Sequence, residues 1–523
     1  MKISQFFLTI SIHVMTEPNL EKGQVILVGA GPGDIGLLTL RGKDWLVRAD
    51  VVIYDHLVNS NMLRFAGSAE LIYVGKKAGH ATVTQNKINE LLVNSANAGK
   101  IVVRLKGGDP FIFGRGGEEV HALKEADIRF TIVPGIPSPV GVSAYAGIPL
   151  THRDHASTIS IITGSNEHGK EHLKLDWENI STRTGTLVFL MGARKLPRIV
   201  EQLIKFKKKP DTPVAVIQWG TTSRQKTWVG TLNTIVDIAA KEKIQPPTLT
   251  IIGEVVNLKS ITDWYETLPL FGKTFVVTRA EEQAESFIHM LEERGAEAFL
   301  YSSIKTIPPV DWSPLDKSLE ILSNYDGLIF TSVNGVHFFS QRLKEKNKDI
   351  RELKGVRIYA IGPKTEQAVR NLNIRVDTVP ENYVAESLIE CIGKENIEGK
   401  KFLLPRASVA REILPNTLRE MGAIIDVVPA YQTILPESFE SDFLKRLDEG
   451  SIDVITFTSS STVTNFLDRL NKEHHEKLNK IVVACIGPIT QKTAENRGLK
   501  VTIVPSQYTV TGLISAIEDY FKK

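Results

Sequence analysis

The sequence predicts an α/β protein made of two unlike parts, and three observations lead to this prediction. Through its first half, near-continuous β-branched apolar runs alternate with longer helical patterns. Such runs are typical of buried, largely parallel strands. The alternation breaks at residues 264–272, and beyond the break three motifs recur in the same order. Because one hydrophobic core rarely exceeds about 250–300 residues, the 523 residues are expected to form several units.

Six apolar runs in the first part have the length and the β-branched content of buried strands. They occupy residues 25–28, 51–54, 101–104, 159–162, 187–190 and 214–217. In open α/β sheets, ligands bind at the loops that follow the strands. We therefore expect the binding residues directly after these runs.

Domain boundaries follow from breaks in the pattern. The segment from Trp264 to Gly272 has little periodicity and contains Pro269, and a new strand pattern begins at residues 274–278. The short apolar run near Met1 lacks the length and the cleavage site of a secretory signal. We expect an N-terminal extension over residues 1–23, a first domain over 24–263, a linker over 264–272 and a second domain over 273–523.

The second domain contains an internal repeat. Residues 275–280 match 402–407, residues 326–332 match 453–459, and residues 360–363 match 485–488. The offset is 127 residues for the first two pairs and 125 for the third. This period is too long for a solenoid. It predicts two similar α/β lobes with a cleft between them, where small-molecule sites often lie.

Composition excludes several classes of protein. The chain has 63 Lys and Arg against 60 Asp and Glu, a balance that gives no indication of nucleic-acid binding. Its two cysteines, Cys391 and Cys485, are too few for a disulfide scaffold or a four-cysteine zinc site, and they fit a reducing compartment. No segment has the roughly 18 apolar residues of a membrane span. We expect a cytoplasmic protein with no metal site and no membrane or nucleic-acid partner.

A glycine-rich turn, Gly29-Ala-Gly-Pro-Gly-Asp34, follows the first predicted strand. A dinucleotide fingerprint needs G-x-G-x-x-G, and this turn lacks the third glycine at that spacing. Two interpretations stay open, a tight strand-to-helix turn and a nucleotide-binding loop of another kind. A dinucleotide-dependent oxidoreductase is disfavoured by the spacing.

The stretch from Lys106 to Gly117 is the most unusual in the chain. Gly107 and Gly108 directly follow a strand, so the backbone can approach a ligand closely. Asp109 has the chemistry to accept hydrogen bonds from ribose hydroxyls or an amine, and Arg115 to bind an anion bidentately. The alternative is a glycine-rich loop without a ligand. In a later loop, Arg153 is either a carboxylate ligand or a structural polar residue.

Taken together, these motifs resemble the uroporphyrinogen-III C-methyltransferases of the tetrapyrrole methylase family. The resemblance covers residues 24–263 and is carried by residues 29–34, 52–55, 74–79, 102–119 and 145–153. It implies a two-lobed α/β methylase that takes a methyl group from S-adenosylmethionine. This fold is not the common Rossmann-type methyltransferase, and family members are typically homodimers.

The resemblance also assigns roles to single residues. It implies that Asp55 is a proton acceptor and Lys76 a proton donor. The family usually has Thr-Ala where this chain has Pro137 and Ser138, which puts one hydroxyl contact to the cofactor in doubt. The implied cofactor contacts are Pro32, Gly107, Gly108, Asp109, Ile112, Pro137, Ser138, Met191 and Gly220.

The chemistry of such a methylase is simple in outline. An electron-rich pyrrole carbon attacks the sulfonium methyl group in line, and the protein aligns the two and excludes water. Positive charge then develops on the pyrrole, so a carboxylate such as Asp55 stabilises it or takes a proton. Capping of a helix is the alternative role for Asp55. The substrate is a polycarboxylate, for which the candidate ligands are Arg41, Arg104, Arg115 and Arg153.

In the second domain, small hydroxyl residues and arginines follow the predicted strands. Small hydroxyl residues before a helix present backbone N–H groups to anions, but ordinary helix capping explains them equally well. The candidate substrate ligands are Arg279, Thr331, Ser332, Asn334, Arg406, Thr458 and Ser459.

The second domain resembles uroporphyrinogen-III synthase over nearly all of its length. The matching stretches are residues 277–280, 329–336, 360–365, 430–433 and 456–460. The resemblance implies cyclisation of hydroxymethylbilane with inversion of the last pyrrole ring, without a cofactor. It also implies that Tyr431 assists departure of the hydroxyl group, although a packed tyrosine is an equally good interpretation.

The sequence thus favours a bifunctional enzyme that makes uroporphyrinogen III in its second domain and methylates it twice, to precorrin-2, in its first. This product is a precursor of both sirohaem and cobalamin. Alternative hypotheses are a methylase of the same fold acting on another corrinoid or on a non-tetrapyrrole, and a non-catalytic tetrapyrrole-binding protein. Small-molecule tetrapyrroles and a second copy of the chain are the expected partners.

Overall fold

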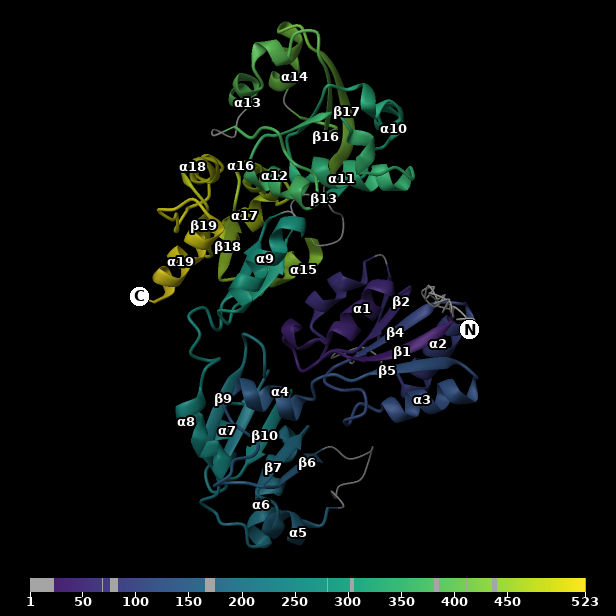
Figure 1. Cartoon of the computed structure of the whole chain (residues 1–523). Helices are drawn as coiled ribbons and strands as arrows, with labels where there is room; N and C mark the ends of the chain where they lie inside the picture. The colour runs from purple at the N-terminus through teal and green to yellow at the C-terminus, as the bar shows by residue number, and fades with distance from the viewer. Residues whose placement is uncertain are drawn as a thin grey trace, which may run out of the picture. The chain divides into compact units, whose positions relative to one another are not determined.

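We describe a computed structural model of the chain (Figure 1). The structure describes residues 23–67, 69–75, 83–164, 175–279, 281–301, 305–380, 385–410, 412–434 and 440–522. The chain divides into two compact units. The first runs to Lys273 and takes in Leu291–Glu297, and the second comprises Thr274–Met290 and Ala298–Lys523. Each unit is described by itself.

The first unit begins with a parallel sheet of order β3-β2-β4-β1-β5. Its strands are β1 (Gln24–Gly29), β2 (Val51–Tyr54), β3 (Glu70–Tyr73), β4 (Ile101–Lys106) and β5 (Arg129–Val133). Alternate residues of the strands join two different cores, one containing Ile26 and Val28 and the other Val25 and Leu27. Burial on both faces explains why the strands read as continuous apolar runs. Helices α1 (Leu40–Arg48), α2 (Gln85–Asn97) and α3 (Gly116–Glu125) cover the sheet.

The second sheet of this unit corrects one expectation. Its order is β6-β7-β10-β8-β9, and only β6 and β7 pair in parallel. The predicted strands are present, but β10 runs antiparallel between β7 and β8, so the sheet is mixed. Its central strands β7, β10 and β8 are buried on both faces, which gives them the apolar runs typical of parallel strands. The strands are β6 (Ile159–Thr163), β7 (Thr186–Leu190), β8 (Pro213–Gln218), β9 (Lys226–Thr231) and β10 (Thr248–Ile252).

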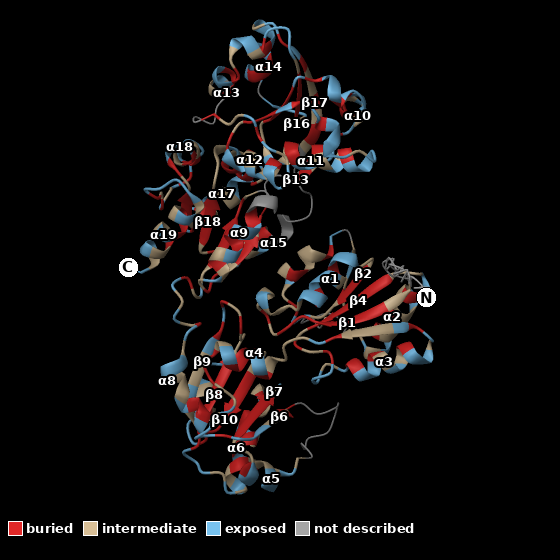
Figure 2. Cartoon of the chain, in the orientation of Figure 1, coloured by how far each residue is buried: buried red, intermediate tan, exposed pale blue. Residues whose placement is uncertain are grey.

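Helices pack around this second sheet, and Figure 2 shows its central strands β7, β8 and β10 buried and the outer helix faces exposed. The helices are α4 (Ser138–Tyr145), α5 (Trp177–Arg183), α6 (Leu196–Lys205), α7 (Ile235–Lys241) and α8 (Lys259–Thr262). The segment predicted to be a linker is packed rather than extended. The Tyr145 ring lies 5.1 Å from that of Trp264 and 4.7 Å from that of Tyr265. Leu270 is fully buried.

The second unit contains two sheets. One has the order β12-β11-β18-β19, from strands β11 (Thr274–Val277), β12 (Glu297–Leu300), β18 (Val454–Phe457) and β19 (Val482–Cys485). The other has the order β13-β17-β16-β14-β15, from β13 (Lys305–Ile307), β14 (Gly327–Phe330), β15 (Arg357–Ala360), β16 (Lys401–Ala407) and β17 (Ile424–Ile434). The α/β class predicted from the sequence is confirmed in both units.

The helices of the second unit connect these strands, and Figure 1 shows them around both sheets. They are α9 (Glu281–Glu292), α10 (Ser313–Glu320), α11 (Val333–Glu345), α12 (Pro363–Arg370), α13 (Ala385–Ile392), α14 (Ile413–Glu420), α15 (Glu440–Asp448), α16 (Ser460–Leu467), α17 (Lys472–Leu478), α18 (Pro488–Asn496) and α19 (Val510–Phe521).

The strands of each sequence repeat are divided between these two sheets. By the sequence match, β11 corresponds to β16, β14 to β18 and β15 to β19, so the order β12-β11-β18-β19 matches β17-β16-β14-β15. Each lobe therefore combines strands from both repeats. Two equivalent hydrogen bonds join them: Asp453 Oδ2 accepts from Thr274 N at 2.8 Å, and Asp326 Oδ2 accepts from Lys401 N at 2.9 Å.

A partly buried ion pair clamps α10 to α11. Asp316 accepts from Arg342 Nε and Nη2, both at 2.7 Å, and these hydrogen bonds hold the pKa of Asp316 below its usual range. We expect Asp316→Asn to lower the free energy of unfolding by about 1 kcal/mol at pH 7. Because the folded-state pKa is depressed, this stability exists above the unfolded pKa of about 4 and is lost as the pH falls through the folded value.

Urea denaturation of the full chain at pH 7 and pH 3 checks this expectation. The matched control is Glu320→Gln, an exposed carboxylate at the end of the same helix. A loss of stability in Asp316→Asn that is equally large at both values of pH would contradict the account.

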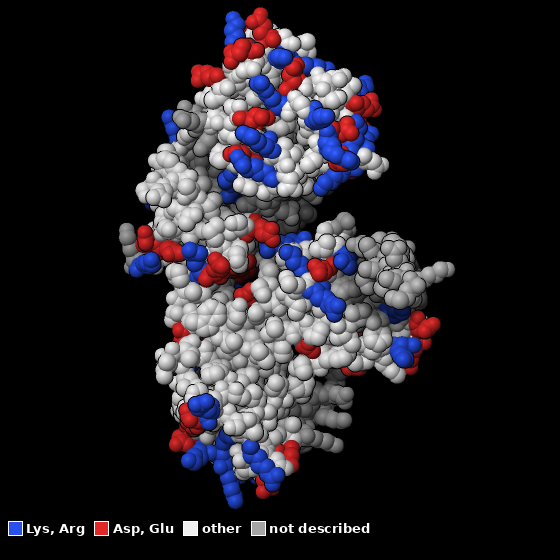
Figure 3. Space-filling model, viewed as in Figure 1, with Lys and Arg blue, Asp and Glu red and all other residues white. Residues whose placement is uncertain are grey.

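None of the described helices is both long enough and apolar enough to cross a membrane. On the face seen in Figure 3, basic and acidic side chains are interspersed over both units.

Candidate active sites

Three loops of the first unit converge through glycines. A Cβ atom on Gly135 would lie 2.2 Å from the carbonyl oxygen of Gly108 and 2.7 Å from the Cα of Gly29. Gly31 and Gly108 also exchange two backbone hydrogen bonds, of 3.1 and 2.7 Å. Only glycine permits this approach, so these positions fix the backbone around the loop ends.

Asp109 holds two of these loops together. Its Oδ1 accepts a hydrogen bond from Phe111 N at 2.8 Å, and its Oδ2 accepts one from Gly135 N at 3.0 Å. Both carboxylate oxygens therefore have backbone partners. The geometry gives Asp109 a role in shaping the loops, and its contact to a ligand remains a prediction.

Pro32 and Gly220, two further predicted cofactor residues, lie beside helix α4. A Cβ on Gly141 of α4 would lie 2.6 Å from Pro32 Cγ, and one on Gly220 would lie 2.3 Å from Val142 Cγ1. Thr221 Oγ1 accepts a hydrogen bond from Asp34 N at 3.2 Å. The turn after β1 and the turn after β8 thus meet at this helix.

The N-terminus of α4 carries the departure from the family pattern. Pro137 is the N-cap residue and makes no side-chain capping bond. A Cβ on Gly108 would lie 3.5 Å from Ser138 Oγ, so a hydroxyl group does lie close to this loop. Ser138 therefore places a hydroxyl group next to Gly108.

Two of the predicted cofactor residues have exposed apolar side chains. Ile112 is 42% exposed and Met191 53%. Met191 adopts a positive φ of 54°, which is uncommon for a residue with a side chain. Exposed apolar groups on strained backbone are suited to contact a ligand.

Asp55 lies directly after β2 and pairs with a buried cation. Its Oδ1 accepts from Arg104 Nη2 at 2.6 Å. The Asp55 side chain is 32% exposed, whereas that of Arg104 is 2% exposed. A substrate can therefore reach the carboxylate but not the guanidinium, and the expectation that Arg104 binds a substrate carboxylate is wrong.

The remaining candidates of the first unit are scattered. Lys76 lies outside the described residues. Arg115 is exposed and binds Glu118 bidentately, with two distances of 2.7 Å. Arg41 is exposed on α1, and Arg153 is exposed in the turn closed by the bridge between His152 and Ala156.

In the second unit, Tyr431 is buried in the second half of β17. Its ring stacks on that of Phe338 at 5.8 Å, and its hydroxyl lies 3.1 Å from Ser332 Oγ. Ser332 is also the N-cap of α11, accepting from Gly335 N at 3.0 Å. The structure therefore brings Tyr431 and Ser332 together.

The other strand-end residues group by sheet. Strand β14 runs parallel to β16, so Thr331 and Ser332 follow at the same edge as Arg406, which pairs with Glu412. In the other sheet, β11 is parallel to β18, so Arg279 shares an edge with Thr458 and Ser459. Burial lowers the pKa of Arg279. Each lobe thus has one arginine and one hydroxyl pair at its carboxyl edge.

Helix capping, the alternative left open by the sequence, accounts for part of this pattern. Ser459 forms a capping box with Thr462 at the start of α16. Asn334 Nδ2 donates to Thr306 Oγ1 at 3.2 Å.

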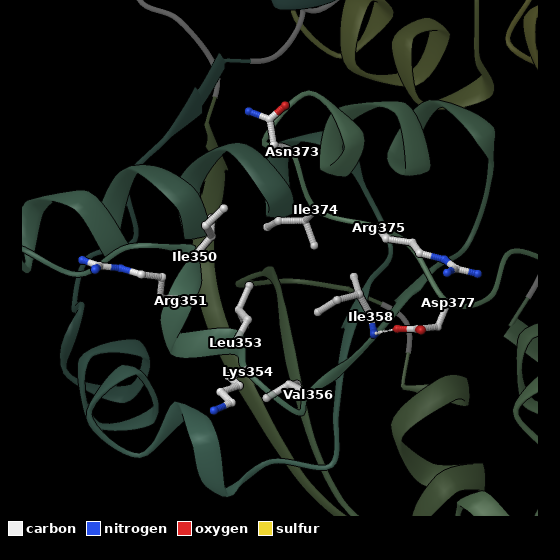
Figure 4. Close-up of a pocket in the computed structure, with 10 residues that line it drawn as sticks. All are labelled: Ile350, Arg351, Leu353, Lys354, Val356, Ile358, Asn373, Ile374, Arg375 and Asp377. Carbon is white, nitrogen blue, oxygen red and sulfur yellow. Dashed lines mark hydrogen bonds between the residues drawn. The ribbon is translucent and has the colours of Figure 1, made fainter.

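A pocket of about 450 Å³ lies away from all of these residues (Figure 4). It is lined by residues near the start of β15, among them Val356, Ile358 and Asp377. The parallel strands place the candidate residues at the opposite edge of this sheet. Among the described residues, no cluster of His, Cys, Asp or Glu is arranged to hold a metal ion.

Gly135, Thr221 and Glu119 were not among the predicted site residues. For Glu119, which pairs with Arg104 and Lys106, the sequence carried a signal, because these two cations interrupt an otherwise apolar strand. Buried cations need acidic partners, and such a partner had to come from elsewhere in the chain.

Comparison with known proteins matches both parts of the chain. Residues 24–236 match the family of tetrapyrrole (corrin/porphyrin) methylases, and residues 285–515 match uroporphyrinogen-III synthase HemD. The chain is 35% identical to the porphyrin biosynthesis protein HemD of Ruminiclostridium josui over 499 residues, which covers 95% of this chain and 98% of that relative.

Other similarities cover the first part alone. The chain is 50% identical over 236 residues to the uroporphyrinogen-III C-methyltransferase of Priestia megaterium, covering 45% of this chain and 99% of that protein. It is also similar to the structure of uroporphyrin-III C-methyl transferase from Thermus thermophilus complexed with S-adenyl homocysteine, at 39% identity. That match covers 45% of this chain and 100% of the other, with a TM-score of 0.40.

Proposed function

The chain belongs to the family in which a tetrapyrrole methylase is fused to a uroporphyrinogen-III synthase, and from this premise we propose that it catalyses two consecutive reactions. The second unit cyclises hydroxymethylbilane to uroporphyrinogen III with inversion of the last ring. The first unit methylates that product twice to precorrin-2. The observation that carries the proposal is the relative that matches 95% of the chain and so includes both parts.

S-Adenosylmethionine supplies the electrophilic methyl group of the methylase reaction. The geometry of the first unit fits this cofactor, because three strand-end loops meet at glycines and leave their backbone open to close approach by a ligand. We assign the cofactor site to these loops. The proposed contacts are Pro32, Gly107, Gly108, Asp109, Ile112, Pro137, Ser138, Met191 and Gly220.

In this proposal the Asp55 carboxylate acts on the pyrrole ring that is methylated. Its carboxylate stabilises the positive charge that develops on the ring and accepts the proton that leaves it. The exposure of Asp55 at a strand end supports this role. Lys76 is proposed as the proton donor by resemblance alone. Arg115 and Arg153 are proposed to bind substrate carboxylates, because both are exposed cations in loops of this unit.

In the synthase, the proposed role of Tyr431 is to donate a hydrogen bond to the departing hydroxyl of the bilane. The Ser332 hydroxyl holds the phenol in place. The substrate carboxylates bind arginines and the N–H groups at helix starts. The proposed ligands are Arg279, Thr331, Ser332, Asn334, Arg406, Thr458 and Ser459.

We expect Tyr431→Phe to lower kcat for cyclisation about tenfold, because one hydrogen bond to the leaving group is lost. The stacked ring remains, so KM for hydroxymethylbilane is expected to change little. Stopped-time assays of uroporphyrinogen III formation measure both constants. The matched control is Tyr508→Phe, an exposed tyrosine of the same unit. Equal kcat in Tyr431→Phe and the wild type would remove Tyr431 from the mechanism.

Titration calorimetry with S-adenosylmethionine distinguishes the methylase from a non-catalytic tetrapyrrole-binding protein. Saturable binding at one site per chain supports the methylase proposal, and the absence of any binding would contradict it. Assays with uroporphyrinogen III and with later corrinoids distinguish the proposed substrate from the alternatives. We also propose that the protein is a cytoplasmic homodimer that associates through its first unit, which light scattering of the full chain tests.

A further inference from the structure

Two cations lie inside the first sheet. Arg104 and Lys106 are two residues apart on β4 and so project from the same face. Their side chains are 2% and 4% exposed. Both contact Glu119 of α3, which is completely buried: its Oε1 accepts from Arg104 Nε at 3.0 Å and from Lys106 Nζ at 2.8 Å. The proposed methylase mechanism uses neither Lys106 nor Glu119.

Arg104 connects this acid to Asp55. The guanidinium donates through Nε to Glu119, through Nη1 to the Ile53 carbonyl at 3.2 Å, and through Nη2 to Asp55 at 2.6 Å. A guanidinium is planar and rigid, so fixing Nε and Nη1 also fixes the direction of Nη2. The contact to Glu119 therefore determines where Arg104 holds the Asp55 carboxylate.

The charges of this cluster balance in pairs. Burial lowers the pKa of Lys106, and the charge of Arg104 lowers it further. Burial alone would also lower the pKa of Arg104, but Asp55 and Glu119 outweigh burial and raise it. An unpaired buried charge costs several kcal/mol, so the two cations need both acids. Of the two acids in this cluster, Glu119 is the one whose side chain has no contact with solvent.

We propose that Glu119 is a positioning residue for methyl transfer, which acts through Arg104 to orient the Asp55 carboxylate and to set the charge around it. This inference rests on the proposed function of the first unit. Other groups near the cluster in the described part of the chain are Gln85 of α2, 3.3 Å from Glu119 Oε1, and the ionisable Glu118, Tyr54, Tyr73 and His56.

The test is the pH profile of kcat for methylation of uroporphyrinogen III. Glu119→Gln keeps the shape of the side chain but removes the negative charge that pairs with Arg104 and Lys106. Arg104 keeps its positive charge and has Asp55 as its remaining acidic partner, so Asp55 becomes harder to protonate and the acid limb is expected to move down by about one pH unit. We also expect kcat to fall about tenfold, with KM for S-adenosylmethionine within twofold of the wild type.

Lys106→Met makes the opposite prediction. Removing one cation makes Asp55 easier to protonate, so the acid limb is expected to move up. A purely structural cluster would not give shifts of opposite sign. The matched control is Glu125→Gln, an exposed acid on the same helix, which is expected to follow the wild-type profile. Unshifted acid limbs in Glu119→Gln and Lys106→Met, or shifts in the same direction, would overturn the inference.

Failure of the proposed function is distinguishable from failure of this inference. If the wild type does not methylate uroporphyrinogen III, the proposed function is wrong. In that case a crystal structure of Glu119→Gln decides the positioning inference alone: a displaced Arg104–Asp55 contact supports it, and an unchanged contact overturns it. If Glu119→Gln does not fold, the direction of the shift in Lys106→Met decides it.

Discussion

Asp55→Asn is expected to lower kcat for methyl transfer by about 10²–10³-fold, because general acid–base and charge-stabilising groups contribute on this order. Asparagine keeps an oxygen that accepts from Arg104 Nη2, so the side chain stays close to its place. It lacks the charge that stabilises the methylated ring and the basicity that removes its proton. S-Adenosylmethionine affinity is expected to stay within about threefold.

Initial rates with labelled S-adenosylmethionine measure this effect, and calorimetry measures the affinity. Asp44→Asn, an exposed acid on α1, is the matched control and is expected to behave as the wild type. Synthase activity of the same preparation reports that the second unit is intact. A rate within threefold of the wild type in Asp55→Asn would contradict the assigned role.

Gly135→Ala is expected to weaken S-adenosylmethionine binding at least tenfold and to lower the free energy of unfolding by about 1–3 kcal/mol. The added Cβ would lie 2.2 Å from the Gly108 carbonyl oxygen and 2.7 Å from the Cα of Gly29. Both neighbours are backbone atoms, so neither contact is relieved by a side-chain rotation. The loops after β1, β4 and β5 must therefore separate. Because these loops form the proposed cofactor site, binding and stability fall together.

A glycine in the neighbouring motif provides the control. A Cβ on Gly117, in the first turn of α3, would meet nothing within 4 Å. Gly117→Ala is expected to bind S-adenosylmethionine as the wild type does, and to be slightly more stable because alanine favours the helix. Calorimetry and thermal unfolding of both variants check the pair. Equal affinities in Gly135→Ala and Gly117→Ala would show that the close contact of Gly135 with Gly29 and Gly108 does not shape the cofactor site.

The sequence predicted the α/β class, the two families and most strands, because these depend on local patterns. Buried apolar runs such as residues 25–28 and 214–217 indicate strands, whether the adjacent strands of the sheet are parallel or antiparallel. The same property hid the antiparallel direction of β10, since burial on both faces produces one pattern for parallel and antiparallel strands.

Other features depend on contacts between distant residues. The motifs of the two repeats have similar sequences. The sequence alone therefore does not tell whether Asp326 pairs with a residue of its own repeat or with Lys401 of the other repeat. Arg104 was predicted to bind substrate because a guanidinium suits carboxylates. Instead its side chain is buried and donates to Glu119 and Asp55, which come from other elements of the fold. The hydrogen bond from Gly135 N to Asp109 likewise joins residues from two loops that are distant in the sequence.

The most direct test of the whole account is one incubation of the full chain with hydroxymethylbilane and S-adenosylmethionine, followed by product mass and isomer analysis. The account predicts a type-III macrocycle that has gained two methyl groups. An unmethylated type-III product would contradict the role of the first unit, and a type-I ring would contradict the role of the second.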